Sequence, residues 1–305
     1  MRHCVRNSRN ERMLLARIEK TIDANFAEHP ESPTSVTSPG VEGDAAMKWV
    51  TTEDAQLRCE HLPRPGAPAL LLLNPLGTSL EIWDDSFAAL SERFELVRYD
   101  ARGHGESTTG SKTELTMEQL ARDALAVLDS CGIARAHLCG VSIGGMTAMQ
   151  IATLSPDRVL KIALCSTTPY MAAPNWSERI QAVRTQGVAP LIDGILQRWF
   201  TTPYRMAHPE TVERIRAMLL TVKPQGYAAC AAAIRDMDQR QSIKTITAKT
   251  LVIGGTQDPG TTPADHALIA ASIPGAQLVM LEAAHLLHIE RQAEFIEALL
   301  QFLAA

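Results

Sequence analysis

A serine between two glycines is the residue of this 305-residue chain that is most clearly placed to do chemistry. The pentapeptide Gly140-Val141-Ser142-Ile143-Gly144 follows the apolar run 136–139 and precedes a helix-forming run, 145–150. A strand that turns this tightly into a helix holds its serine in a strained conformation, which requires small residues at both glycine positions. The turn exposes the Ser142 hydroxyl and points the N-terminus of the next helix at it, where free N–H groups stabilise an oxyanion. The pentapeptide therefore predicts a serine nucleophile and a hydrolase.

An acid and a base follow this serine in the order that such a site needs. The apolar run Thr250–Gly255 predicts a buried parallel strand, and Asp258 lies in the loop directly after it. Another strand, predicted over 276–281, leads into a loop that carries His285. We expect His285 to take the proton of Ser142 and return it to the leaving oxygen, while the Asp258 carboxylate fixes the tautomer and stabilises the imidazolium.

Other residues compete for the roles of base and acid. His288 lies three residues after His285, but at the start of the predicted last helix, which carries its side chain away from the strand ends. Asp265 and Glu282 are alternatives to Asp258, although a first helical turn and a solvated strand end are ordinary places for carboxylates. Asp258 alone directly follows a strongly apolar strand, so we favour it.

The second oxyanion donor is expected from the loop after the first strong strand, Ala69–Leu73. This loop has the sequence Asn74-Pro75-Leu76-Gly77-Thr78, and its position is the one that supplies a backbone N–H to a serine in such a turn. Gly77 lets the chain turn back without steric cost. We assign the N–H groups of Leu76 and Ile143 to the oxyanion hole.

Strands and helices that would position these residues alternate along most of the chain. Strands are predicted at 48–51, 69–73, 96–99, 136–139, 159–165, 250–255 and 276–281, and helices at 83–90, 117–128 and 289–303. This alternation predicts an α/β fold with a mainly parallel sheet covered on both faces. Over 167–245 the strand signals stop and apolar residues recur at helical spacing, which predicts an inserted helical lid of about four elements. The core would then comprise 47–166 and 246–305.

Several short motifs lie at the ends of these predicted strands and at the starts of the segments that follow them. They are Asn74–Thr78 with Trp83-Asp84, Tyr99–Gly105, Gly140–Met146, and Ala284-His285 with Ile289-Glu290. Together they resemble the α/β-hydrolase superfamily. Further segments lie in the lid: Trp176 and Arg179, Arg198–Thr201, Gly226–Cys230, and Arg235–Asp238. These are similar to 3-oxoadipate enol-lactonases, enzymes of protocatechuate and catechol breakdown. The resemblance extends from about Met47 to the C-terminus.

The resemblance implies an α/β-hydrolase fold and the opening of a lactone or ester through an acyl-enzyme, with no cofactor and no metal. The implied substrate is 3-oxoadipate enol-lactone. Three positions depart from the family: Tyr170 stands where the enol-lactonases carry a basic residue, Pro75 where they tend to have serine, and Ser86 near a place where they tend to have glutamine. A carboxylate-bearing substrate requires a cation in the pocket, which Arg179 or Arg198 would have to supply.

Tyr170, Trp176 and Trp199 are further candidates for substrate contact, although a lid stripe of this kind is more often core. The loss of the basic residue at Tyr170 favours an alternative, a carboxylesterase or a lactonase for a different, possibly neutral, substrate. An acyltransferase or haloperoxidase-like enzyme on the same triad, and a receptor that only binds its ligand, are the remaining alternatives. Hydrolysis of a nitrophenyl ester separates the receptor from the enzymes.

Composition is consistent with one enzyme domain, since 46% of the residues are hydrophobic and 21% are charged. The net charge of −5 argues against a nucleic-acid or anionic-membrane partner, so any attraction for an anionic substrate must be local to the pocket. The cysteines show no paired spacing, and we expect them to be reduced core residues of a cytoplasmic protein. They are Cys4, Cys59, Cys131, Cys139, Cys165 and Cys230.

Residues 1–46 differ in composition from the rest. Residues 1–20 are rich in arginine, and 28–46 are rich in proline, serine, glycine and acidic residues. Neither stretch can bury a useful apolar face, so we expect the segment to be disordered. The apolar stretch Met13–Ile18 is too short for a signal-peptide core or a membrane span.

Overall fold

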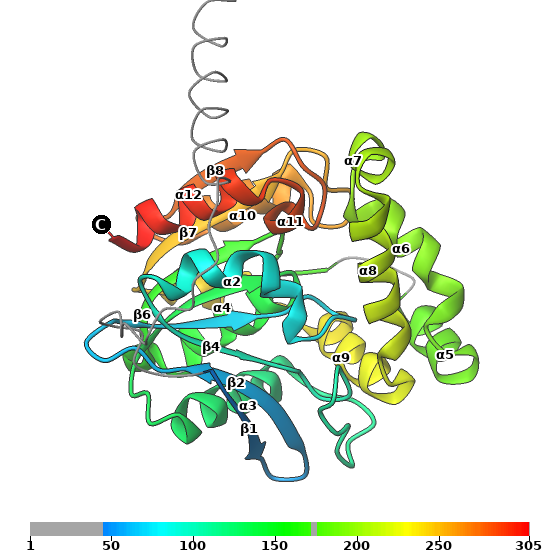
Figure 1. Ribbon diagram of the computed structural model, residues 1–305, viewed down its shortest axis with the longest axis horizontal. Coiled ribbons are helices and arrows are strands. Elements are labelled where there is room, and N and C mark those ends of the chain that lie inside the picture. Colours follow the sequence, from blue (N-terminus) through cyan, green and yellow to red (C-terminus); the bar gives the residue numbers. More distant parts are fainter. Residues whose placement is uncertain (1–44, 172–175, 305) are drawn as a thin grey trace, which may run out of the picture. The chain divides into compact units, whose positions relative to one another are not determined.

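The computed structural model describes residues 45–171 and 176–304 (Figure 1). The disorder predicted for residues 1–46 therefore falls outside the described part, except at its end, where the first strand begins at Ala46. The hydrolase core and the inserted helices belong to one compact unit of the chain.

An eight-stranded sheet forms the core, in the order β1-β2-β4-β3-β5-β6-β7-β8. The strands are β1 Ala46–Thr51, β2 Gln56–Leu62, β3 Ala69–Leu73, β4 Glu95–Tyr99, β5 Ala136–Val141, β6 Val159–Cys165, β7 Lys249–Gly255 and β8 Gln277–Leu281. β1 pairs antiparallel with β2 and β2 with β4, whereas all other neighbours are parallel. Every residue of β3 and β5 is buried, as expected for central strands covered on both faces. The predicted α/β-hydrolase fold is confirmed.

Helices cover both faces of the sheet. They are α2 Asp84–Ser91, α3 Met117–Ser130, α4 Ile143–Leu154, α10 Pro263–Ser272, α11 Leu287–Glu290 and α12 Gln292–Ala304. The step from β3 to β4 runs toward one edge, while the steps through α3, α4 and α10 run toward the other. Because such crossovers are right-handed, α2 lies on one face and α3, α4 and α10 lie on the opposite face. α12 packs against α2 and so shares its face.

The region inserted between β6 and β7 is helical, as predicted. Its helices are α5 Trp176–Gln186, α6 Ile192–Trp199, α7 Thr202–Ala207, α8 Pro209–Thr221 and α9 Pro224–Asp236. Figure 1 shows α5 to α8 grouped beside the sheet, in yellow-green. α5 packs against α9 and α6 against α8. The insertion thus contains five α-helices where about four elements were expected.

Two elements differ from the prediction. The single last helix expected over 289–303 is divided into α11 and α12 at Arg291, which has φ −129° and ψ 52°. The Arg291 Nε donates to the carbonyl oxygen of Glu282 at 3.0 Å, so the break anchors the end of β8. In addition, β2 was not predicted, although Leu57, Cys59 and His61 alternate as buried residues along it.

The turn from β5 into α4 has the strained backbone that its glycines predicted. Ser142 has φ 58° and ψ −121°, a conformation that a residue with a side chain rarely adopts. A Cβ at Gly140 would overlap the carbonyl oxygen of Gly144, and a Cβ at Gly144 would overlap that of Leu73. The two glycines are therefore required by close backbone approaches on either side of Ser142.

We predict that Gly144→Ala lowers the free energy of unfolding by at least about 2 kcal/mol, because backbone must move to admit the methyl group. Gly194→Ala is the matched control: the nearest atom to its Cβ is the Arg198 Nη1 at 3.5 Å, and it lies inside α6. That change should be neutral or stabilise by up to about 1 kcal/mol. Chemical denaturation measures both, and a wild-type midpoint for Gly144→Ala would contradict the packing described.

Candidate active site

One cavity collects the three residues for which the sequence predicts a nucleophile, an acid and a base. Ser142, Asp258 and His285 all line it. They follow β5, β7 and β8, whose carboxyl ends lie at one edge of the sheet because the strands are parallel. The Ser142 N–H donates to the carbonyl oxygen of Cys165 at 2.9 Å, and its carbonyl oxygen accepts from the Thr167 Oγ1 at 2.8 Å. Hydrogen bonds to the last residue of β6 and to the segment after it therefore hold the strained serine on both sides.

Asp258 and His285 are directly bonded. The Asp258 Oδ2 lies 2.7 Å from the His285 Nδ1 and accepts from the Thr261 Oγ1 at 2.7 Å. The Asp258 Oδ1 accepts from the backbone N–H groups of Gly260, at 2.8 Å, and Thr261, at 3.1 Å. Burial alone raises the pKa of Asp258, but the charge of His285 and these hydrogen bonds outweigh it and lower the pKa below its usual value. An ionised Asp258 places the histidine proton on Nδ1 and leaves Nε2 free to accept another.

His288, the alternative base, lies in the hydrophobic core. Only 1% of its surface is exposed, and its ring packs between Trp83, at 4.9 Å, and Phe295, at 6.0 Å between centroids. Burial lowers the pKa of His288 to about 3, so it is uncharged at neutral pH. The cavity that holds Ser142 is lined by His285 and, within the described residues, not by His288.

The alternative acids have other partners. The Asp265 Oδ2 accepts from the Thr262 N–H and Oγ1, both at 2.7 Å, which completes a capping box at the start of α10. Glu282 is exposed at the end of β8. Neither carboxylate is among the described residues that line the cavity with Ser142.

The loop after β3 brings Leu76 to the same cavity, while Ile143 opens α4 beside Ser142. Asn74 anchors this loop: its Nδ2 donates to the carbonyl oxygen of Tyr99, and its Oδ1 accepts from the Trp83 Nε1, both at 2.8 Å. Ile143 is the first residue of α4, and the first N–H groups of a helix have no partner within the helix. The Ile143 N–H is therefore free of helical bonding at the end of α4 where Ser142 lies. The roles of the Leu76 and Ile143 N–H groups as oxyanion donors remain predictions that fit this placement.

Gly77 also brings the loop against the lid. Its φ is 90°, in the left-handed region that favours glycine. A Cβ there would lie 2.7 Å from the Leu219 Cδ2 in α8 and 3.4 Å from the Tyr227 ring in α9. The glycine therefore serves both the turn, as expected, and a close contact with the lid, which the sequence did not reveal.

Of the residues expected to contact substrate, Trp176, Arg179, Arg198 and Trp199 line the cavity from the lid. The Arg179 Nη2 donates to the Tyr227 hydroxyl oxygen, and its guanidinium lies over the rings of Trp176 and Tyr227, at 4.9 and 5.5 Å from their centroids. Burial and the positive charge of Arg179 lower the pKa of Arg198. Two cations thus share one wall of the cavity.

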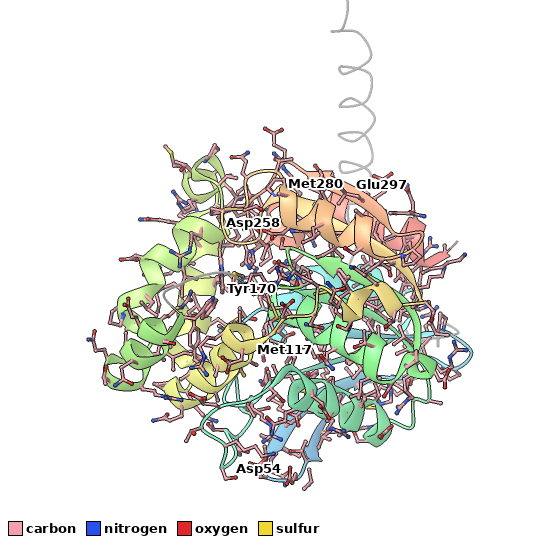
Figure 2. All side chains as sticks on the ribbon, turned by 180° about the vertical axis from the view of Figure 1, so that it is seen from behind. Asp54, Met117, Tyr170, Asp258, Met280 and Glu297 are labelled. Atoms are coloured by element: carbon pink, nitrogen blue, oxygen red, sulfur yellow. The ribbon has the colours of Figure 1, made fainter. Side chains whose placement is uncertain are left out.

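Tyr170 does not join them, contrary to its predicted role. Its backbone bridges to Asp238, and its ring lies 4.0 Å beneath the Arg240 guanidinium, on a side chain that is 36% exposed. Figure 2 labels Tyr170 and Asp258 and shows them apart along the border between the sheet and the lid. Tyr170 was named because it stands where the enol-lactonases carry a basic residue, but here its backbone pairs with Asp238 and its ring packs under Arg240.

Among the cavity-lining residues that sequence reasoning did not predict, Thr261 and Tyr227 have side chains that hydrogen-bond to candidate site residues. Thr261 bonds Asp258, and its Oγ1 also lies 3.5 Å from the His285 Nδ1. Tyr227 is 1% exposed, and its hydroxyl oxygen accepts from Arg179. Tyr227 belongs to a lid segment that the family resemblance singled out, whereas no sequence signal distinguishes Thr261 from an ordinary loop threonine.

The sequence matches the family model described as "alpha/beta hydrolase fold" over residues 68–292. The chain belongs to the α/β-hydrolase family. It is 34% identical to 3-oxoadipate enol-lactonase 2 of Acinetobacter baylyi over 82% of this chain and 93% of that protein. Within the described part of the chain, no helix is long and apolar enough to cross a membrane.

Solved structures of other α/β-hydrolases have the same fold. An enol-lactonase from Burkholderia xenovorans LB400 is 36% identical, with a TM-score of 0.82 over 85% of this chain and all of that one. A malate-bound thermophilic esterase from Thermogutta terrifontis is 27% identical, with a TM-score of 0.79 over 85% of this chain and 98% of that one.

We predict that His285→Leu lowers kcat for a nitrophenyl ester by about 10⁴-fold or more, because His285 is the one histidine among the described residues that line the cavity. His288→Leu, in the neighbouring helix α11, should stay within about tenfold of wild type, because leucine preserves the apolar contacts. Circular dichroism would verify that both variants are folded. A larger loss for His288→Leu than for His285→Leu would transfer the role of base to His288.

Proposed function

We propose that this α/β-hydrolase is a serine hydrolase that opens 3-oxoadipate enol-lactone through an acyl-enzyme. The observation that carries the proposal is one cavity lined by Ser142, by the bonded pair of Asp258 and His285, and by Arg179 and Arg198 of the lid. The identity of about a third to 3-oxoadipate enol-lactonases supports the choice of substrate.

In the proposed mechanism, the Ser142 hydroxyl attacks the lactone carbonyl while its proton passes to the His285 Nε2. The Leu76 and Ile143 N–H groups stabilise the oxyanion. The ring C–O bond then breaks, and the leaving enolate oxygen takes the proton from His285 but stays tethered to the acyl chain. Water, deprotonated by His285, attacks the acyl-enzyme, and the returning proton releases Ser142 and the free acid. The Asp258 carboxylate stabilises the imidazolium at each transfer.

The lid wall of the cavity supports an anionic substrate. Arg179 and Arg198 both line it, and the charged or polar neighbours that act on Arg198 are Arg179 and Tyr227 rather than a carboxylate. The Trp176 Nε1 and the Arg179 Nε are buried N–H donors without a hydrogen-bond partner in the described part of the chain. The two guanidinium groups on this wall fit a ligand group that only accepts hydrogen bonds, as a carboxylate does.

A second candidate function is a carboxylesterase or lactonase for a neutral substrate. Arg179 bonds Tyr227 and packs on Trp176, and these contacts give it a structural role that needs no substrate carboxylate. The likeness to the Thermogutta terrifontis esterase supports such an activity in this fold.

Charge selectivity separates the two candidates. We predict that wild type consumes 3-oxoadipate enol-lactone, followed by loss of the enol chromophore, and that Ser142→Ala does not. Arg179→Met or Arg198→Met keeps an apolar stem but removes the charge-assisted hydrogen bonds. At least one of them should lower kcat/KM for this lactone by roughly 10- to 150-fold, about 1.5 to 3 kcal/mol, and leave a neutral nitrophenyl ester nearly unaffected.

Equal effects of each arginine change on both substrates would mean that neither side chain binds the carboxylate, and the neutral candidate would replace the lactone. Arg205→Met serves as the control for a lid arginine, because Arg205 bonds the carbonyl oxygens of Gln197 and Phe200 and does not line the cavity among the described residues. It should not discriminate between the substrates.

A further inference from the structure

The loop that carries His285 is bonded on both sides of the histidine, to the lid at Leu286 and to α11 at Ala284. The Leu286 N–H donates to the carbonyl oxygen of Trp199 at 2.9 Å. The Ala284 N–H donates to the Glu290 Oε2 at 3.1 Å. The backbone groups next to His285 therefore depend on partners outside their own loop or strand.

Glu290 continues this connection into the lid. Its Oε2 also accepts from the Thr201 N–H at 3.2 Å, and its Oε1 bonds the Thr201 Oγ1. Thr201 is the N-cap of α7, where its Oγ1 accepts from the Tyr204 N–H at 3.3 Å. Since one hydroxyl can donate once, the Thr201 proton is directed to Glu290. The 8% exposed carboxylate thus bridges the lid and the residue before His285.

The same lid segment also contacts the imidazole. Trp199 lies two residues before Thr201, and its ring stacks on that of His285 with 6.3 Å between centroids and 25° between planes. The segment Trp199–Thr201 therefore contacts His285 through its ring, through Leu286 and, by way of Glu290, through Ala284. These contacts join the corner between α6 and α7 to the proposed base.

We propose that Glu290 is a positioning residue that ties the alignment of His285 to the lid. Glu290 does not touch the reacting atoms; it holds the Ala284 N–H and Thr201 together, so that His285 and Trp199 keep one relative geometry. The inference rests on the proposed function, because it takes His285 as the base. It adds that the lid corner is part of the catalytic alignment as well as of the substrate-binding wall.

Glu290→Gln tests this role, because the amide has one acceptor oxygen in place of two. With that oxygen at the Oε2 position, the Thr201 hydroxyl loses its acceptor; with it at the Oε1 position, an NH2 group faces the N–H donors of Ala284 and Thr201. A displacement of the base by about an ångström can cost on the order of a hundredfold in rate. We expect kcat for a nitrophenyl ester to fall roughly 10- to 100-fold while KM changes less than about threefold. Inactivation of Ser142 by a fluorophosphonate, which also needs the base, should slow by a similar factor.

Glu282→Gln is the matched control, since Glu282 precedes His285 by three residues but is exposed. It removes the same charge on the other side of His285 in the sequence and should leave both rates unchanged. A merely structural role for Glu290 would lower the melting temperature without slowing kcat in the folded protein. Rates are therefore measured at least 15 °C below each melting transition.

A second pair of variants covers the case in which Glu290→Gln does not fold. Thr201→Val removes the hydroxyl that donates to Glu290, and Thr201→Ser restores it. We expect kcat to fall about tenfold in the first and to recover in the second. Wild-type kcat in Thr201→Val, or in a folded Glu290→Gln protein, would overturn the inference.

Failure of this inference can be told from failure of the proposed function. If Ser142→Ala or His285→Leu retained the wild-type rate, the proposed function itself would be wrong, and the inference with it. If both were inactive and Glu290→Gln behaved like Glu282→Gln, only the role of Glu290 would be lost.

Discussion

The close approach of Gly144 to the end of β3 is the constraint on which the site depends. A Cβ at this position would overlap the carbonyl oxygen of Leu73 and lie 3.0 Å from that of Asn74. Leu73 ends the central strand, and Asn74 begins the loop that carries Leu76. One backbone contact thus sets the N-terminus of α4 against that loop. Leu76 and Ile143, the predicted oxyanion donors, line one cavity beside this contact.

Close contacts also join the lid to the core. Gly77 contacts α8 and α9 directly, and Gly103 approaches the backbone of Gly226 so closely that neither could carry a side chain without movement. The Lys223 N–H donates to the carbonyl oxygen of Gly103 at 2.9 Å. Together with the bonds between the His285 loop and the α6–α7 corner, these contacts make the lid a wall of the site rather than a separate cover.

Local sequence patterns predicted the parts of the site that are encoded locally. Ser142 is marked by its glycine pattern, in which Gly140 avoids overlap with nearby Gly144, and Asp258 follows a strand whose buried run is continuous. Both signals can be found without tertiary knowledge. The order of the elements was sufficient for the sheet and its inserted helices, whereas β2 was missed because a cysteine and a histidine fill two of its buried positions.

The contacts that the sequence could not reveal join residues far apart in the chain. Tyr170 was expected in the pocket, but its pairing with Asp238 and Arg240, across the whole lid, turns it away. The Tyr227 hydroxyl oxygen accepts from Arg179, and the Glu290 carboxylate accepts from the Thr201 hydroxyl. Such pairings depend on how the lid folds back, which neither periodicity nor spacing specifies.

The central claim is that the strained Ser142 becomes acylated during turnover, and mass spectrometry of the acid-quenched protein tests it most directly. Incubation with a nitrophenyl ester should add the mass of the acyl group to the peptide that contains Ser142, and His285→Leu should abolish this addition. Hydrolysis at the wild-type rate by a Ser142→Ala protein, or an acyl group found only on another residue, would contradict the account.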